Sequence, residues 1–163
     1  MQKVITDLSE LKLLGISTRT SNSNETNPET AKILPTIQNW FHNQLAAKIP
    51  NRRKPTTTNC VYAQYESDEN GEYTYFVGEE VSNHDNIPDS FECLTIPSQT
   101  YVKFTNGPSA MPEVCISVWQ DIWNMNAVDL GGRRTYLADF EIYDERAQDP
   151  QNTVLDIYIG IQS

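Results

Sequence analysis

The chain has 163 residues, of which 38% are hydrophobic and 21% are charged, and this composition predicts one folded domain rather than a disordered chain. Its 22 acidic and 12 basic residues give a formal net charge of −10, so it lacks the basic surface that direct nucleic-acid binding requires. Three widely spaced cysteines, a polar start and no long apolar run argue against a disulfide framework, a zinc knuckle, secretion and a membrane span. We therefore expect a cytoplasmic protein.

The first half of the chain predicts the element order strand, helix, strand, strand. Residues 11–20 are rich in Leu, Ile and Thr, as in a strand. Apolar residues then recur at helical spacing over 33–45, and this helix is expected to end at Ile49-Pro50 because the residue before a proline avoids the α region. Residues 60–67 and 73–82 are aromatic and β-branched. Between them, residues 68–71 end in Asn70-Gly71, and Asn-Gly is a strong hairpin signal.

The second half repeats this order. Residues 91–106 are extended, with Pro97 predicting a break or an edge position. A helix follows Pro112, with apolar and aromatic residues on one face, and a closing hairpin is formed by 134–144 and 153–162. The duplication is also visible in short matches that keep the same order: 37–40 with 116–119, 61–66 with 136–141, and 75–78 with 157–160.

These patterns predict an α+β fold made of two βαββ units related by a pseudo-two-fold axis. One repeat spans about 11–82, the other about 91–162, and residues 83–90 link them. A lone βαββ unit is marginal, whereas two units can join into one mostly antiparallel sheet with two long helices on one face. A groove between the helices, floored by the sheet, is then a natural ligand cleft.

The duplicated order resembles the gyrase-inhibitor-like superfamily of effector-binding domains, which occur in AraC-type and multidrug-responsive regulators and as free-standing proteins. The resemblance extends from Leu11 to Gln162 and is strongest to free-standing members encoded on integron gene cassettes, which bind cationic drugs. It implies a single effector-binding domain over 1–163. No basic DNA-reading segment precedes residue 11, so we do not expect direct transcription control. The motifs that carry the resemblance are Leu14-Gly15-Ile16, Tyr65-Glu66-Ser67-Asp68, Ile96-Pro97, Trp119 with Trp123, Asp139-Phe140-Glu141-x-Tyr143 and Asp156-Ile157-Tyr158-Ile159.

The resemblance places an acidic residue within an aromatic pocket, and Glu141 occupies that position. Tyr158, Trp119 and Trp123 match its aromatic places. Tyr143 shares the side of Glu141 because side chains two residues apart on a strand face the same way. Phe76 and Tyr101 are further aromatic candidates. An organic cation would pair with the carboxylate in a low dielectric and gain cation–π contacts with the rings.

The residues alone leave other interpretations open. Glu141 could face water or form an ion pair with Arg133 or Arg134, and its repeat counterpart Glu66 is expected to be solvated. Three functions remain possible: a module that binds aromatic cations as a sensor or sequestering protein, a hydrolase of electrophilic compounds that uses Glu141 as base, or an acidic protein-interaction module. The first could act with a separate regulator protein. No motif for a cofactor, metal or phosphate is found in the sequence.

Overall fold

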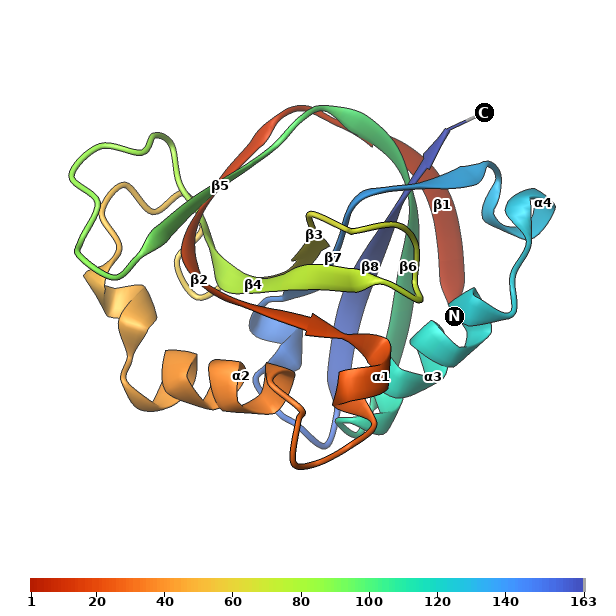
Figure 1. Cartoon of the computed structure of the whole chain (residues 1–163), viewed down its shortest axis with the longest axis horizontal. Helices are drawn as coiled ribbons and strands as arrows, with labels where there is room; N and C mark the ends of the chain where they lie inside the picture. Colours follow the sequence, from red (N-terminus) through yellow and green to blue (C-terminus); the bar gives the residue numbers. More distant parts are fainter. Residues whose placement is uncertain (163) are drawn as a thin grey trace.

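The computed structural model describes residues 1–162, and these form one antiparallel sheet with helices packed on its outer face (Figure 1). The strand order is β1-β6-β8-β7-β3-β4-β2-β5. The strands span β1 Gln2–Leu8, β2 Leu11–Ser21, β3 Thr58–Ala63, β4 Glu72–Glu80, β5 Glu92–Ile96, β6 Gln99–Ser109, β7 Arg133–Tyr143 and β8 Thr153–Gln162.

Two long helices cover the sheet on the same side, as Figure 1 shows below the strands. Helix α2 packs through Trp40 against Tyr75 and Val77, and α3 packs through Val114, Val118 and Ile122 against β6 and β8. Within residues 1–162, none of the helices has both the length and the apolar composition needed to cross a membrane. The helical segments are α1 Asn22–Glu25, α2 Ile33–His42, η1 Leu45–Lys48, α3 Glu113–Trp123, α4 Ala127–Leu130 and η2 Glu145–Ala147.

The predicted duplication is confirmed. The first unit is β2-α2-β3-β4 and the second is β6-α3-β7-β8. The strand order reads β6-β8-β7 on one side of the centre and β2-β4-β3 on the other, so the two units meet at the β3–β7 pair and are related by a pseudo-two-fold axis. The α+β fold with two long helices on one face is therefore what the periodicities indicated.

The structure also contains a strand that the sequence pattern did not reveal. Residues 2–8 form β1, which lacks a clear apolar alternation and owes its position to pairing with β6, far away in the chain. The break predicted at Pro97 within the extended segment 91–106 is confirmed, and it divides the segment into β5 and β6. The first long helix ends at His42, before the predicted end at Ile49-Pro50, and a short 3-10 helix follows it.

The added strands close the sheet on itself. β1 runs into β2 across two residues, and β5 runs into β6 across two residues. The two continuous strands pair with each other, β1 with β6 and β2 with β5, and they arch over the side of the sheet away from the helices (Figure 1). The inner face of the curled sheet is a core in its own right, which includes Leu13, Val61, Phe76, Tyr101 and Phe140.

The inner core generates a stability prediction. Phe140 is buried, stacks on Tyr158 at 4.6 Å and meets the Tyr101 ring edge-on at 5.2 Å. We expect Phe140→Ala to lower the free energy of unfolding by about 3–5 kcal/mol, because it leaves a cavity among close-packed rings. Urea denaturation measures this loss. Leu137→Ala on the same strand is the control, because Leu137 is 45% exposed and should change stability by less than about 0.5 kcal/mol. Similar losses in both variants would contradict the inner core.

Candidate functional site

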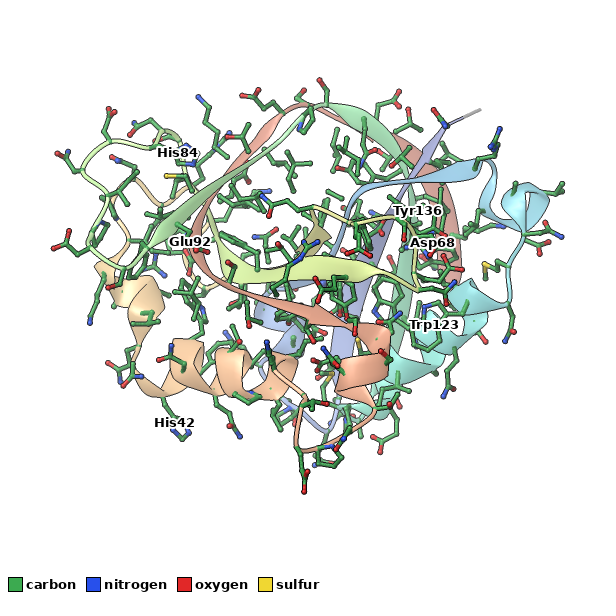
Figure 2. The ribbon with its side chains drawn as sticks, in the orientation of Figure 1. His42, Asp68, His84, Glu92, Trp123 and Tyr136 are labelled. Atoms are coloured by element: carbon green, nitrogen blue, oxygen red, sulfur yellow. The ribbon has the colours of Figure 1, made fainter. Side chains whose placement is uncertain are left out.

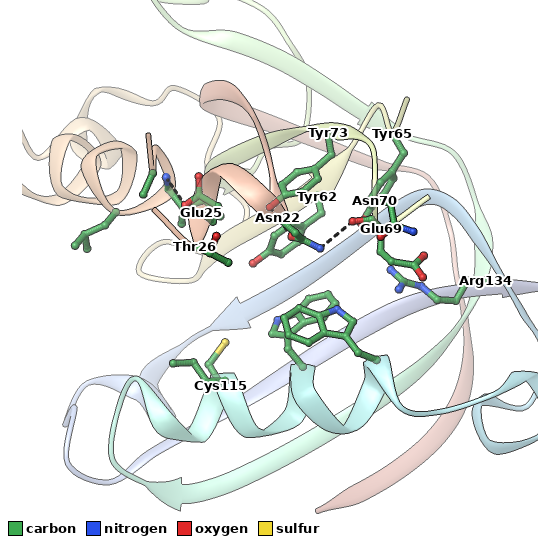
Figure 3. Close-up of a pocket in the computed structure, with 16 residues that line it drawn as sticks. Asn22, Glu25, Thr26, Tyr62, Tyr65, Glu69, Asn70, Tyr73, Cys115 and Arg134 are labelled. Carbon is green, nitrogen blue, oxygen red and sulfur yellow. Dashed lines mark hydrogen bonds between the residues drawn. The ribbon is translucent and has the colours of Figure 1, made fainter. Parts of the chain in front are cut away.

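A cavity of about 790 Å³ lies between the two long helices, floored by the sheet (Figure 3). Its floor carries the tyrosines Tyr62, Tyr65 and Tyr73 from β3, β4 and their hairpin, and one wall carries Trp119 and Trp123 from α3. The opposite wall is formed by the segment from α1 to the start of α2. This is the groove between the helices that the duplicated fold predicted.

Glu141 lies under this aromatic floor and is only 4% exposed. Its carboxylate accepts hydrogen bonds from the Tyr62 hydroxyl at 2.8 Å, from Trp119 Nε1 at 2.7 Å and from the Tyr143 hydroxyl at 2.7 Å. Among residues 1–162 no Lys, Arg or His forms an ion pair with it. Glu141 is therefore neither solvated nor paired with an arginine, and its three partners are all neutral donors.

The groups around Glu141 are held in their protonated forms. Burial, reinforced by the charge of Glu141, raises the pKa of the Tyr62 and Tyr143 hydroxyls well above the usual range. The same causes, in the same order, raise the pKa of the Cys115 thiol, which borders the cavity. These groups consequently remain neutral at physiological pH, and the hydroxyls stay available as donors to the carboxylate.

Strand alternation places Glu141 on the helix side. Glu141 and Tyr143 point out of β7 towards α3, while Phe140 and Ile142 point into the inner core. Trp119 lies in the middle of α3, where its ring meets Tyr62 edge-on at 5.1 Å. Trp123 is one turn further along, with its ring 6.3 Å from that of Trp119, and it is 53% exposed at the rim of the cavity.

A second buried carboxylate lies behind two residues that line the cavity, Tyr65 and Arg134, but it is neutralised. Asp139 is fully buried and forms an ion pair with Arg134 Nη2 at 2.7 Å. It also accepts hydrogen bonds from the Tyr65 hydroxyl at 2.6 Å and from the backbone N–H of Gly160 at 2.9 Å. Arg134 in turn stacks on the Tyr136 ring at 4.4 Å. The sequence pattern did not single out this network, although Asp139 and Arg134 stand five residues apart on one predicted strand. Of these two buried acids of β7, only Glu141 lacks a cationic partner within residues 1–162.

The prediction that Phe76, Tyr101 and Tyr158 line the same groove is wrong. All three project from the opposite face of the sheet: Phe76 and Tyr101 are buried in the inner core, and Tyr158 packs against it. On β8 the more apolar alternate residues, such as Ile157, lie under α3, so Tyr158 faces inward. Both faces of this sheet are covered, so apolarity alone did not identify the face that carries the groove.

The structure brings three of the predicted residues together by hydrogen bonds, namely Glu141, Trp119 and Tyr143. Trp123 also borders the cavity. The floor tyrosines Tyr62, Tyr65 and Tyr73 were missed. Their signal was the aromatic-rich hairpin of the first repeat, in which Tyr62, Tyr65 and Tyr73 accompany Phe76.

Neither histidine contributes to this cavity. Figure 2 shows His42 pointing away from the molecule on the far side of α2, well separated from Trp123. His84 is also remote in that view, and its ring Nε2 lies 3.0 Å from the Leu13 carbonyl. Glu66, the repeat counterpart of Glu141, is exposed as predicted. In the described part of the chain, the buried acid beneath the cavity floor that has no cationic partner is therefore Glu141.

Comparison with solved structures agrees with this architecture. An integron cassette protein of Vibrio cholerae superposes with a TM-score of 0.77 at 25% identity, covering 98% of this chain and 95% of that one. SAV2435, solved bound to tetraphenylphosphonium, superposes with a TM-score of 0.78 at 15% identity, covering 100% of this chain and 95% of that one. At that identity SAV2435 shows the shared fold.

Sequence comparison identifies the family. The Bacillus subtilis (strain 168) protein YobU, named for a role in transcription regulation, is 31% identical over 159 residues, which are 97% of this chain and 96% of YobU. The family model described as integron-associated effector binding protein matches residues 4–161. The chain therefore belongs to the family of integron-associated effector-binding proteins, and it is a ligand-binding module.

Proposed function

We propose that the cavity between α2 and α3 binds aromatic organic cations, with Glu141 as the complementary charge. The observation that carries this proposal is the environment of Glu141: a buried carboxylate held by three neutral donors and by no cation. A buried charge is costly unless a counter-charge compensates it. A lipophilic cation supplies that charge and is itself weakly hydrated, so its own desolvation costs little.

The rings above Glu141 support the aromatic part of the proposal. Tyr62 and Trp119 both border the cavity and both donate a hydrogen bond to the Glu141 carboxylate. The hydrogen bond to the anion polarises each ring system, which makes the ring face at the cavity surface more attractive to a cation. A cation over such a ring gains about 0.5–2 kcal/mol per contact. The ligand therefore does not need to reach Glu141 directly, because the aromatic floor lies between them.

The comparison with SAV2435 supports the same ligand class. That protein was solved with tetraphenylphosphonium, which is an aromatic cation, and it shares the fold over the whole chain. We propose that the output of binding here is sequestration of the ligand, or presentation of the ligand-bound form to a separate regulator protein.

The role of Glu141 is tested with a cation and a neutral analogue. We expect Glu141→Gln to weaken tetraphenylphosphonium binding by about 10-fold or more, or about 1.4 kcal/mol, because Gln keeps the size of the side chain and removes its charge. Binding of neutral triphenylphosphine oxide should change little. Tryptophan-fluorescence titration measures both affinities.

Glu66→Gln is the matched control, since Glu66 is exposed and lies outside the cavity. It should leave both affinities unchanged. If Glu141→Gln weakens the cation and the neutral compound equally, the charge of Glu141 does not select the ligand and the proposal fails.

The aromatic floor is tested separately. Trp119→Phe keeps an aromatic ring but removes the donor to Glu141, and Trp123→Phe keeps a ring at the rim, where no Glu141 contact exists. Isothermal titration with tetraphenylphosphonium should show a loss of about 3-fold to 30-fold for Trp119→Phe, because the Phe ring is a weaker cation–π partner than indole and no longer donates to Glu141. The loss for Trp123→Phe should be smaller, and the reverse order would contradict the importance of the floor next to Glu141.

A further inference from the structure

The Glu141 carboxylate has no oxygen left for a ligand on its cavity side. Its Oε2 accepts two hydrogen bonds, from the Tyr62 hydroxyl at 2.8 Å and from Trp119 Nε1 at 2.7 Å, and both donors belong to residues that line the cavity. Two donors occupy both lone pairs of a carboxylate oxygen. The other oxygen, Oε1, accepts from the Tyr143 hydroxyl at 2.7 Å, behind the lining residues. A ligand therefore meets the charge of Glu141 but not its hydrogen-bond acceptors.

The surface over Glu141 consists of ring faces. Tyr62 and Trp119 meet edge-on at 5.1 Å and their polar atoms are turned towards the carboxylate, while Trp123 continues the wall with its ring 6.3 Å from that of Trp119. A ring face attracts a positive charge but is only a weak acceptor for an N–H group. A cation placed here is therefore held by charge and by ring contacts alone.

The carboxylate at one end of the cavity is also occupied. Figure 3 shows Glu25 to one side of Tyr62, next to the start of α2. Its Oε2 accepts from the Thr20 hydroxyl at 2.6 Å and from the backbone N–H of Lys32 at 2.9 Å. Its Oε1 accepts from the backbone N–H of Ile33 at 3.2 Å. Glu25 thus holds the start of α2, and its oxygens are used within the fold.

The carboxylate at the other end lies beside a positive charge. Glu69 accepts a hydrogen bond from the Tyr136 hydroxyl, and the Arg134 guanidinium stacks on the ring of Tyr136 at 4.4 Å. Figure 3 shows Glu69 next to Arg134, on the opposite side of Tyr62 from Glu25. Arg134 already supplies the positive charge at this end. The part of the cavity that attracts a cation is consequently the ring surface over Glu141.

We propose that this cavity selects cations that carry no N–H group, such as quaternary ammonium and phosphonium ions, over protonated amines of the same skeleton. This inference rests on the proposed function of the same cavity. An ammonium N–H that leaves water must find an acceptor, and a charged donor that is buried without one is costly. A fully substituted cation has no such donor, so it loses little when it moves from water onto the rings.

The probes are 1-naphthylmethyl-trimethylammonium and 1-naphthylmethylammonium, which share one ring system and each carry a single charge near neutral pH. Isothermal titration of the unmodified protein should give an affinity at least about 10-fold higher for the trimethylammonium ion, because the protonated amine leaves charged donors without acceptors. The additional methyl groups also add apolar contact, so the ratio of the two affinities is compared between variants.

Trp119→Phe tests the cause of the selection. The smaller ring removes one donor to Glu141 Oε2 and opens a path to the freed lone pair, so the protonated amine gains an acceptor. The ratio of the two affinities should therefore fall by about 3-fold or more. Trp123→Phe is the matched control, because Trp123 stands at the rim and makes none of the three hydrogen bonds to Glu141. Its ratio should equal that of the unmodified protein.

The inference is overturned if the protonated amine binds as tightly as the trimethylammonium ion. It is also overturned if the ratio in Trp119→Phe stays at the value of the unmodified protein, or changes equally in Trp123→Phe. Tetraphenylphosphonium separates these results from the proposed function. If it binds and Glu141→Gln weakens its binding while the two ammonium ions bind alike, only the selection against N–H groups fails. If it does not bind, the proposed function fails and this inference fails with it.

Discussion

The alternation of side chains along β7 is the constraint on which both faces of the molecule depend. Asp139, Glu141 and Tyr143 point towards the helices, while Phe140 and Ile142 point into the curled sheet. A shift of one residue would exchange these sets, burying two carboxylates among apolar rings and placing apolar side chains beneath the aromatic floor. The register of β7 against β3 and β8 therefore fixes the position of the buried charge and the integrity of the inner core together.

The two buried acids of β7 illustrate how one strand can carry a structural and a binding group two residues apart. Asp139 is neutralised by Arg134 and ties β7 to β8 through the Gly160 N–H, so its charge is used within the fold. Glu141 receives hydrogen bonds but no positive charge. Hydrogen bonds from neutral groups stabilise a carboxylate without cancelling its field, which is why its charge remains available to a ligand above the rings.

The sequence predicted what depends on local pattern. The helices over Trp40 and Trp119, the hairpins and the repeat order follow from periodicity and turn residues, and so does the common side of Glu141 and Tyr143. The sequence did not predict features set by distant pairing. The strand Gln2–Leu8 exists because β6 lies beside it, and Tyr158 faces inward because α3 covers the alternate residues of β8. With apolar layers on both sides of the sheet, no single strand indicates which of its faces meets the helices.

The added strand of each repeat pairs with the first strand of the other repeat, β1 with β6 and β5 with β2. This pairing affects how the chain folds during synthesis. Gln2–Leu8 pairs with Gln99–Thr105, so this strand is synthesised before the second repeat that supplies its partner and must wait for it. Until then the first repeat lacks β5, which pairs with β2, and β7, which pairs with β3. Such long-range pairing predicts slow folding and a nascent chain whose strand edges remain open to association during synthesis. A protein built from two similar repeats is thus obliged to fold as one unit, after its second repeat has been synthesised.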